Sequence, residues 1–377
     1  MSGEPGGLYV HLPYCASRCG YCAFVVTTDP SSRERYLEAL EREAALLETE
    51  ASGAAFDAVY LGGGTPSLLP PASVARLLAA LRRRFHLDEG AEITLEANPE
   101  DVTPAAVAAW QDAGVSRVSL GVQSLADAEL SAVGRRHDAA RAREALALLA
   151  RSALSFSGDL ILGLPGQTPA TFRESLEGLA GAGVGHVSVY LLEAEKSKTI
   201  EEDRRAHPER YLSDDAQADL WLDLGERLAA RGFGHYEISN WALPGREARH
   251  NLKYWRRVPT LGLGVSAHEL WDGRRRANAS NLEQYLGGVE SGRRVLGFDL
   301  PVSPEEQARE EVFLALRLRE GVPVTRLEAF VAAVEDVRLW SDFETWLAEG
   351  ILERRGSRVA FTERGYLLSN EVLSRFV

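Results

Sequence analysis

The sequence predicts an α/β protein, with a full or partial (β/α) barrel followed by a smaller, mainly helical domain. Short apolar segments alternate with helical ones through the first two-thirds of the 377 residues, a pattern typical of βαβ units and a parallel sheet. Several apolar segments end in glycine or polar residues, as expected where barrel strands line a site at their C-terminal ends. The length allows two domains, which we place at residues 1–286 and 287–377.

Seven segments of the first domain are expected to be strands, and a charged helix over residues 31–50 separates the first two. In chain order they are "LYVHL" (8–12), "DAVYLGGG" (57–64), "EITLEANP" (92–99), "RVSLGVQS" (117–124), "GDLILGLPGQTP" (158–169), "HVSVYLLEAE" (186–195) and "HYEISNWA" (235–242). Six or more such units suggest a full or partial (β/α) barrel.

The C-terminal segment has a different pattern. Residues 287–301, "GGVESGRRVLGFDLP", are expected to be a connector. After them we expect helices and then a helix, a short strand, a turn at Gly356, a strand and a helix, which resembles a winged-helix unit. The net charge of −13 argues against nucleic-acid binding, so a packing or lid role is favoured.

The N-terminus "MSGEPGGLYV" lacks the basic region and apolar run of a signal peptide. No apolar run has the length of a transmembrane helix. We therefore expect a cytoplasmic protein.

All three cysteines lie in the segment "YVHLPYCASRCGYCAF" (9–24), at Cys15, Cys19 and Cys22. An odd number of clustered thiols is unlike a disulfide framework, and thiolates are the usual ligands of iron–sulfur clusters. A cubane 4Fe–4S cluster normally takes four ligands, so three cysteines leave one iron open. That iron suits a small chelating molecule such as S-adenosylmethionine (SAM), through its amino and carboxylate groups.

Two alternatives remain at this point. A structural zinc site needs a fourth ligand, which His11 could supply, although the spacing is unfamiliar for zinc. A redox C-x2-C pair of Cys19 and Cys22 leaves Cys15 unexplained.

The spacing C-x3-C-x2-C, with an aromatic residue (Tyr21) before the last cysteine, resembles the signature of the radical SAM superfamily. Within it, "YVHLPYC", "LGGGTPSLL", "LEANPE", "SLGVQS" and "DLILGLPGQT" are similar to the oxygen-independent coproporphyrinogen III oxidase family. The segment "HNLKYW" (250–255) is similar to the haem-chaperone branch of that family. This resemblance covers almost the whole chain and implies a partial barrel of the radical SAM type, with cluster and SAM at its open mouth.

The resemblance also implies roles for individual residues. The three cysteines would ligate three irons. Residues expected to contact SAM are Tyr9 and Tyr21 as flanking rings, Gly64 and Thr65 in the glycine-rich turn, Glu96, Gln123, Arg135 and Asp159 as polar partners, and Glu193. Of these polar partners, Arg135 would pair with the SAM carboxylate and Glu96 would accept from hydroxyl or amine donors.

Haem binding is implied for the segment with His250, Asn251, Tyr254 and Trp255. Haem iron commonly takes His, Cys, Met or Tyr as axial ligand. The cysteines are assigned to the cluster and Met1 is the only methionine. A histidine or a tyrosine is therefore expected as the axial ligand, and the histidines are preferred. His250 is the preferred ligand, with His268 and His11 as competitors.

Two functions from different classes follow. One is a haem chaperone that binds haem, a 4Fe–4S cluster and SAM, and delivers haem to an acceptor protein. The alternative is a coproporphyrinogen dehydrogenase, which requires an electron donor to cleave SAM. The family's oxidases have a further cysteine two positions after the last ligand and a longer N-terminal arm, whereas this sequence has Phe24 there, which favours the chaperone. A radical SAM methyltransferase ranks last, and a homodimer is conceivable if the cluster edge lies at an interface.

Overall fold

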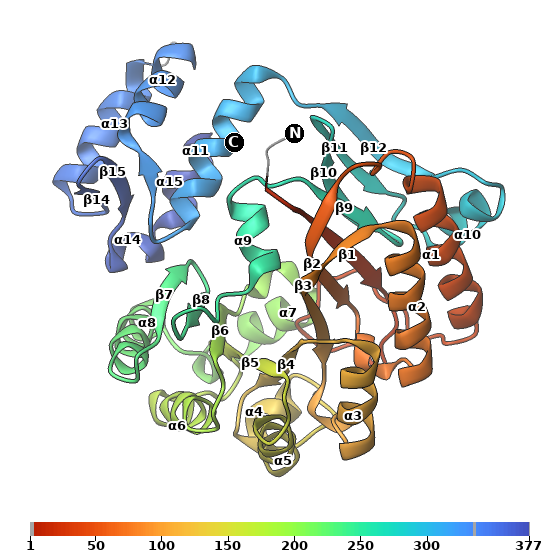
Figure 1. Ribbon diagram of the computed structural model, residues 1–377. Helices are drawn as coiled ribbons and strands as arrows, with labels where there is room; N and C mark the ends of the chain where they lie inside the picture. The colour runs from red at the N-terminus through yellow and green to blue at the C-terminus, as the bar shows by residue number, and fades with distance from the viewer. Residues whose placement is uncertain (1–3, 335–336, 377) are drawn as a thin grey trace.

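The computed structural model describes residues 4–334 and 337–376. Within these residues the largest sheet has twelve strands, in the order β12-β11-β10-β9-β1-β2-β3-β4-β5-β6-β8-β7 (Figure 1). Its strands are β1 (Gly6–Leu12), β2 (Ala55–Gly63), β3 (His86–Ala97), β4 (Arg117–Gln123), β5 (Ser155–Leu162), β6 (His186–Leu191), β7 (Gly234–Glu237), β8 (Asn240–Ala242), β9 (Thr260–Leu263), β10 (His268–Trp271), β11 (Arg274–Asn278) and β12 (Leu296–Pro301).

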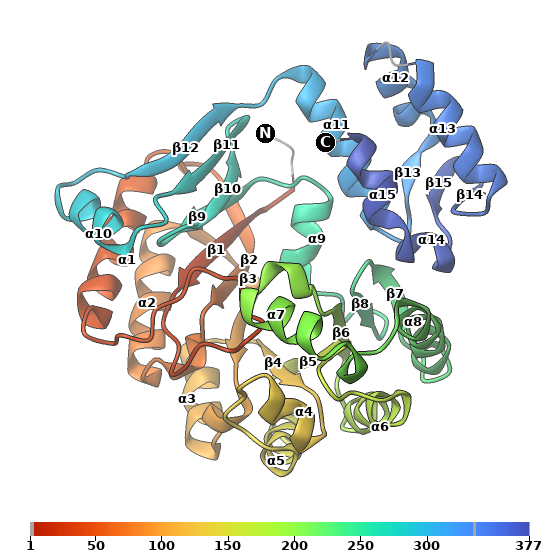
Figure 2. The same ribbon diagram turned by 180° about the vertical axis from the view of Figure 1, so that it is seen from behind.

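Strands β1 to β6 are parallel and form the curved wall of a partial barrel. The helices of this part are α1 (Arg33–Leu47), α2 (Pro71–Arg84), α3 (Pro104–Ala113), α4 (Asp127–Ala132), α5 (Ala139–Ala150), α6 (Pro169–Ala180), α7 (Lys198–Ala206), α8 (Asp214–Ala229), α9 (Arg249–Trp255) and α10 (Leu282–Glu290). In Figures 1 and 2, α1, α2, α3, α5 and α6 lie on the outside of the wall. The predicted α/β partial barrel is confirmed.

Sequence chemistry explains where these helices begin. At the starts of α3 and α6, a threonine side chain accepts from the backbone N–H three residues on, and a proline follows the threonine at the first helical position. Such N-caps satisfy amide groups that the first turn leaves free, and proline has no amide to leave unpaired. The apolar faces of the helices pack on the strands, in one large core that includes Leu8, Leu61 and Leu160.

The wall is extended at both ends by antiparallel strands. On one side β8 pairs with β6, and β7 pairs with β8. On the other side β9 runs parallel to β1, and β10, β11 and β12 continue in antiparallel order. We call β10, β11 and β12 the lateral sheet.

The expected connector at residues 287–301 is wrong in part. The segment contains the end of α10 and the whole of β12, which pairs with β11 from Arg274–Pro301 to Asn278–Leu296. Its glycines obscured the pattern, because glycine is a weak strand and helix former. The boundary at residue 287 stays a prediction, and the large sheet continues to Pro301.

The C-terminal part has its own core, which includes Val312, Leu327, Phe343 and Phe361. It comprises α11 (Pro304–Arg317), β13 (Val322–Pro323), α12 (Val324–Val334), α13 (Val337–Ala348), β14 (Leu352–Arg355), β15 (Arg358–Phe361), α14 (Glu363–Leu367) and α15 (Ser369–Leu373). The β14–β15 hairpin turns at Gly356, whose φ of +61° suits glycine. Helices thus surround a small three-stranded sheet, as the winged-helix-like prediction describes.

None of the helices in the described part of the chain combines the length and apolar character needed to cross a bilayer.

Candidate functional site

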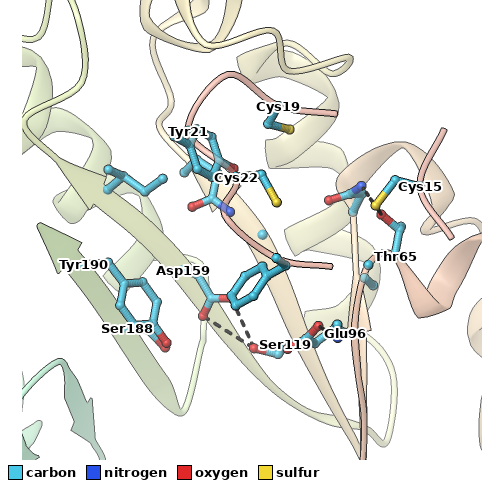
Figure 3. A pocket seen from close by; sticks show the side chains of 18 of the residues that line it. Cys15, Cys19, Tyr21, Cys22, Thr65, Glu96, Ser119, Asp159, Ser188 and Tyr190 are labelled. Carbon is cyan, nitrogen blue, oxygen red and sulfur yellow. Dashed lines mark hydrogen bonds between the residues drawn. The ribbon is translucent and has the colours of Figure 1, made fainter. Parts of the chain in front are cut away.

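A cavity of about 440 Å³ opens at the C-terminal ends of the barrel strands. Figure 3 shows the thiols of Cys15, Cys19 and Cys22 on the loop after β1, on one side of this cavity. Glu96, Ser119 and Asp159, which come from β3, β4 and β5, lie across from that loop (Figure 3). The geometry therefore brings the cysteine segment and the polar strand ends to one place.

The cysteine loop is anchored by its backbone. The Cys15 amide donates to Thr27 O at 2.9 Å, and the Thr27 amide donates to Pro13 O at 2.8 Å, so the two ends of the loop are tied together. Its middle is held by the Gly20 amide, which donates to Val133 O at 3.0 Å. These bonds fix the backbone of the loop that carries the three thiols.

The environment of the three thiols suits the binding of a metal centre. All three are free and half-buried. Burial raises the pKa of the Cys15 and Cys22 thiols, and a bound metal would reverse this by favouring the thiolates. The Arg135 guanidinium lies 3.6 Å from Cys19 Sγ, where it would offset part of a cluster's negative charge. The donor set fits an iron–sulfur cluster with one open iron.

The described residues contain no group of three or more His, Cys, Asp or Glu side chains arranged around a single metal ion. His11, the candidate fourth ligand of a zinc site, has both ring nitrogens engaged. Its Nδ1 lies 3.0 Å from Tyr9 Oη and its Nε2 lies 2.9 Å from Val25 O. His11 therefore does not turn a nitrogen toward the thiols.

The glycine-rich turn after β2 is required by crowding. Gly63 has a φ of +110°, and a Cβ there would lie 2.5 Å from the His11 ring. A Cβ on Gly64 would lie 2.8 Å from backbone atoms of Leu12 and Tyr14. The amides of Gly64 and Thr65 donate to the same stretch, Leu12 O and Tyr14 O, each at 2.8 Å. The amides of this turn, including that of Gly63, which donates to Glu96, are therefore engaged within the protein.

Arg135 connects the cysteine loop to the strand ends. Its NH1 lies 3.4 Å from Tyr21 Oη, and its NH2 donates to Asn98 Oδ1 at 2.6 Å and to Gly121 O at 2.8 Å. Gln123 lies close by, at the end of β4, with a φ of +66°. Such a conformation is unfavourable for a residue with a side chain and is concentrated at functional sites.

Two carboxyl groups face the cavity without a cation at ion-pair distance among the described residues. Tyr60 Oη and the Gly63 amide donate to Glu96 at 2.7 and 3.0 Å. Burial raises the pKa of Glu96 to about 7. Ser119 Oγ donates to Asp159 at 3.2 Å, and burial raises the pKa of Asp159 to about 6. Carboxyls with such raised pKa values in a cavity are candidates for a binding role.

Sequence reasoning missed a polar layer below these groups. Strand register places Glu96, Ser119, Ser157 and His186 side by side on β3 to β6, and the last three, with Ser188, also line the cavity. The signal was present as the alternation of polar and apolar residues in "RVSLGVQ", "SFSGDLIL" and "HVSVYL". Asn98, the partner of Arg135, lies in the motif "LEANPE", but the sequence pattern assigned no role to it.

The other expected contacts are distributed as follows. Tyr21, Gly64, Thr65, Gln123, Arg135, Glu193 and Asn251 line the cavity, whereas Tyr9, His250, Tyr254 and Trp255 do not. Glu193 is at the rim and pairs with Lys196 at 2.6 Å. Tyr9 lies deeper, with its ring near those of Tyr60 and His250.

His250 is enclosed beneath the cavity. It is only 1% exposed, and its ring stacks on Tyr60 with centroids 5.2 Å apart. Its Nε2 lies 2.8 Å from Tyr254 Oη. Burial, with Lys253 as a smaller cause, lowers the pKa of His250 to about 3, so the ring is neutral. Trp255, at the other end of α9, lies beneath the Arg317 guanidinium of α11.

The model of the radical SAM superfamily matches residues 9–179, and a model described as the HemN C-terminal domain matches residues 302–368. The partial barrel, with three clustered cysteines after its first strand, is the arrangement of a radical SAM protein.

Curated relatives make this more specific. The chain is 37% identical to the heme chaperone HemW of Mycobacterium tuberculosis, over 99% of this chain and 95% of that protein. It is 32% identical to HemW of Lactococcus lactis, over 100% and 98%, and 32% identical to HemW of Escherichia coli, over 99% and 98%. The chain belongs to the HemW family.

Among solved structures, coproporphyrinogen III oxidase HemN from Escherichia coli superposes with a TM-score of 0.85 at 24% identity, over 99% of this chain and 90% of that one. At this identity the likeness shows the fold, which includes the C-terminal part.

Proposed function

We propose that this protein is a haem chaperone: it binds haem and passes it to an acceptor protein, while a 4Fe–4S cluster and SAM occupy the barrel mouth. The full-length similarity to proteins named heme chaperones carries this proposal.

Phe24 supports the chaperone over the dehydrogenase. It stands where the family's oxidases are expected to have a further cysteine. Its side chain is 66% exposed and lies at the rim of the cavity. A phenyl ring cannot donate or accept a proton or a hydrogen atom as a thiol does, so this position supplies no acid to a substrate.

The proposed cluster ligands are Cys15, Cys19 and Cys22, and SAM would take the polar positions that face them. Arg135 would reach a carboxylate, and Glu96 and Asp159 would accept from amine or hydroxyl groups. When bound, the cluster supplies an electron-transfer centre and an open iron for chelation. This chain's residues hold, orient and screen the two cofactors.

His250 is the axial haem ligand that the sequence favours. In this structure its Nε2 bonds to Tyr254 and its Nδ1 is buried without a partner in the described part of the chain, so haem could reach the ring only if the residues that enclose it moved aside.

A paired anaerobic assay on the reconstituted protein tests the function. One sample is titrated with haem and followed by absorbance, and the other receives coproporphyrinogen III, SAM and a reductant. Stoichiometric haem binding without protoporphyrinogen formation is expected. Turnover to protoporphyrinogen would make the protein a dehydrogenase despite Phe24.

The cluster ligands are tested separately. Replacing any of the three cysteines by alanine should abolish the visible absorption of the reconstituted cluster, because three thiolates are the minimum ligand set proposed. Ser17→Ala, in the same loop and also at the cavity, is the matched control and should retain it. Full absorption in all three cysteine variants would refute the assignment.

A further inference from the structure

The lateral sheet has two unlike faces. On one face Glu269, Arg276 and Asn278 are buried in a network that includes Glu43 of α1. In both ribbon views α1 and α10 lie along that side of the sheet (Figures 1 and 2). The other face therefore points away from these helices.

Strand register defines the residues of this second face, because cross-strand partners project to the same side of a sheet. One row consists of His268, Ala277 and Phe298, and the next of Leu270, Arg275 and Leu300. We call these six residues the lateral patch. Ala277 and Leu270 are buried, so the side chains that reach the surface are those of His268, Arg275, Phe298 and Leu300. Three strands span about 10 Å across.

Apolar side chains are unusually open here. Phe298 is 37% exposed and Leu300 is 59% exposed, and they are among the few large apolar side chains that the described residues leave exposed. Both belong to β12, an edge strand that pairs with β11 on one side only. Exposed apolar groups that gather in one place mark interaction sites more often than scattered ones do.

The patch includes a histidine on β10, at the opposite end of its row from Phe298. The His268 side chain is exposed, and its ring meets the Phe298 ring with centroids 5.6 Å apart. Among the described residues, no hydrogen bond or ion pair engages its ring nitrogens. His250, in contrast, is enclosed and bonded to Tyr254.

We propose that the lateral patch is the haem-docking surface, with His268 as the axial ligand of the iron and Phe298 and Leu300 beneath the porphyrin plane. This inference rests on the proposed haem function and deepens it by assigning the site.

The chemistry of the patch matches each part of haem. An imidazole suits iron, and an aromatic ring with an aliphatic neighbour suits the apolar macrocycle. Arg275 suits a propionate, because its Nε donates to Glu310 at 2.8 Å and its other guanidinium nitrogens remain for a carboxylate. Burial and the nearby Arg275 lower the pKa of His268, so at neutral pH the ring is in the neutral form that metals bind.

The proposal is tested by haem titration of the full chain, followed by Soret absorbance, for wild type, His268→Ala, His250→Ala and His86→Ala. His86→Ala is the matched control, since His86 is also an exposed strand histidine, remote from the patch. His268→Ala should weaken haem binding at least tenfold and change the Soret position, and added imidazole should restore the spectrum. His250→Ala and His86→Ala should titrate like wild type.

Metal-free protoporphyrin IX separates the ligand from the platform. Because it has no iron, it should bind His268→Ala as tightly as wild type, whereas Phe298→Asp should weaken both haem and protoporphyrin. Reconstituted cluster absorption, equal in all variants, verifies folding.

If His268→Ala binds haem as tightly as wild type, or if imidazole does not restore the spectrum that the variant loses, the assignment of His268 is overturned. The proposal that the protein binds haem would still stand. A wild-type protein that binds no haem overturns the proposed function as well.

Discussion

Two buried polar regions of this protein have similar side chains, but they differ in how fully the carboxylate oxygens are hydrogen-bonded by the protein. Behind the lateral sheet, Glu43 accepts from Gly264 N, Asn278 Nδ2 and Tyr285 Oη, each at 2.7 Å, with Arg294 at 3.3 Å. In the barrel cavity, Glu96 has two donors, Tyr60 Oη and Gly63 N, and no cationic side chain of residues 4–334 or 337–376 pairs with it. The first carboxylate has its lone pairs filled by the protein, whereas the second leaves some for a ligand.

The difference separates structural from binding roles. A saturated network fixes elements that are distant in sequence, here α1 and the strands near residue 270, and its members cannot be removed singly without leaving a buried charge. An unsaturated group beside a cavity costs stability and is retained where a ligand completes it. Substitutions in both regions test this distinction.

The largest effect is expected for Glu43→Gln. The amide keeps the shape but removes the charge that offsets Arg294. Its NH2 group faces donors in either orientation, Gly264 N on one side or Asn278 Nδ2 and Arg294 on the other, so the free energy of unfolding should fall by about 3 kcal/mol. Urea unfolding measures this. Glu38→Gln on the same helix, in an exposed pair with Arg42, should change stability by less than about 0.5 kcal/mol. If Glu43→Gln and Glu38→Gln lowered the free energy of unfolding equally, the Glu43 network would have no special structural role.

A smaller effect of opposite sign is expected for Asp159→Asn. The pKa of Asp159 is raised to about 6, so the folded state holds its proton longer than the unfolded chain does. Its stabilising contribution is complete below about pH 4, the usual carboxyl range, and is lost as pH rises through 6.

That pKa difference is worth about 3 kcal/mol at full burial, and water in the cavity reduces it to about 1–2 kcal/mol. At pH 8, urea unfolding should give Asp159→Asn a higher free energy of unfolding than wild type. Near pH 5 the difference between the two proteins should be smaller. If the variant were less stable than wild type at pH 8, the Asp159 charge would be stabilised by the protein, as that of Glu43 is.

The smallest effect concerns the binding of SAM. If Glu96 must be ionised to accept from SAM, a pKa of about 7 makes wild-type SAM affinity about tenfold higher at pH 8 than at pH 6. Glu96→Gln should bind more weakly at pH 8 and show a flat profile. Equilibrium dialysis with the reconstituted protein measures both. A wild-type affinity independent of pH would remove Glu96 from SAM binding.

The sequence allowed the barrel to be predicted because its strands are local, apolar and regularly spaced by helices. Glu96, Gln123 and Asp159 could be placed at one edge because parallel strands bring their C-terminal ends together. The cysteine segment could be interpreted from ligand chemistry alone.

The remainder depends on tertiary packing. The lateral sheet was missed because its strands are short, and because β12 follows glycine-rich sequence and pairs with β11 across the intervening helix α10. The pairing of β10 with β11 is local, across Asp272 and Gly273. The burial of His250 follows from how α9 rests on Tyr60 and Tyr9, which no local pattern encodes. Position on a motif indicated a ligand, but it did not indicate whether the ring could be reached.

The place of β1 in the sheet has a consequence for biosynthesis. β1 carries the cysteine loop and pairs with β2 on one side and with β9 on the other. Chains emerge from the ribosome N-terminus first, so the second flank of β1 is absent until Leu263, the end of β9, has been translated. During that interval β1 has only one strand neighbour, so the loop with the three cysteines extends from an incomplete barrel wall.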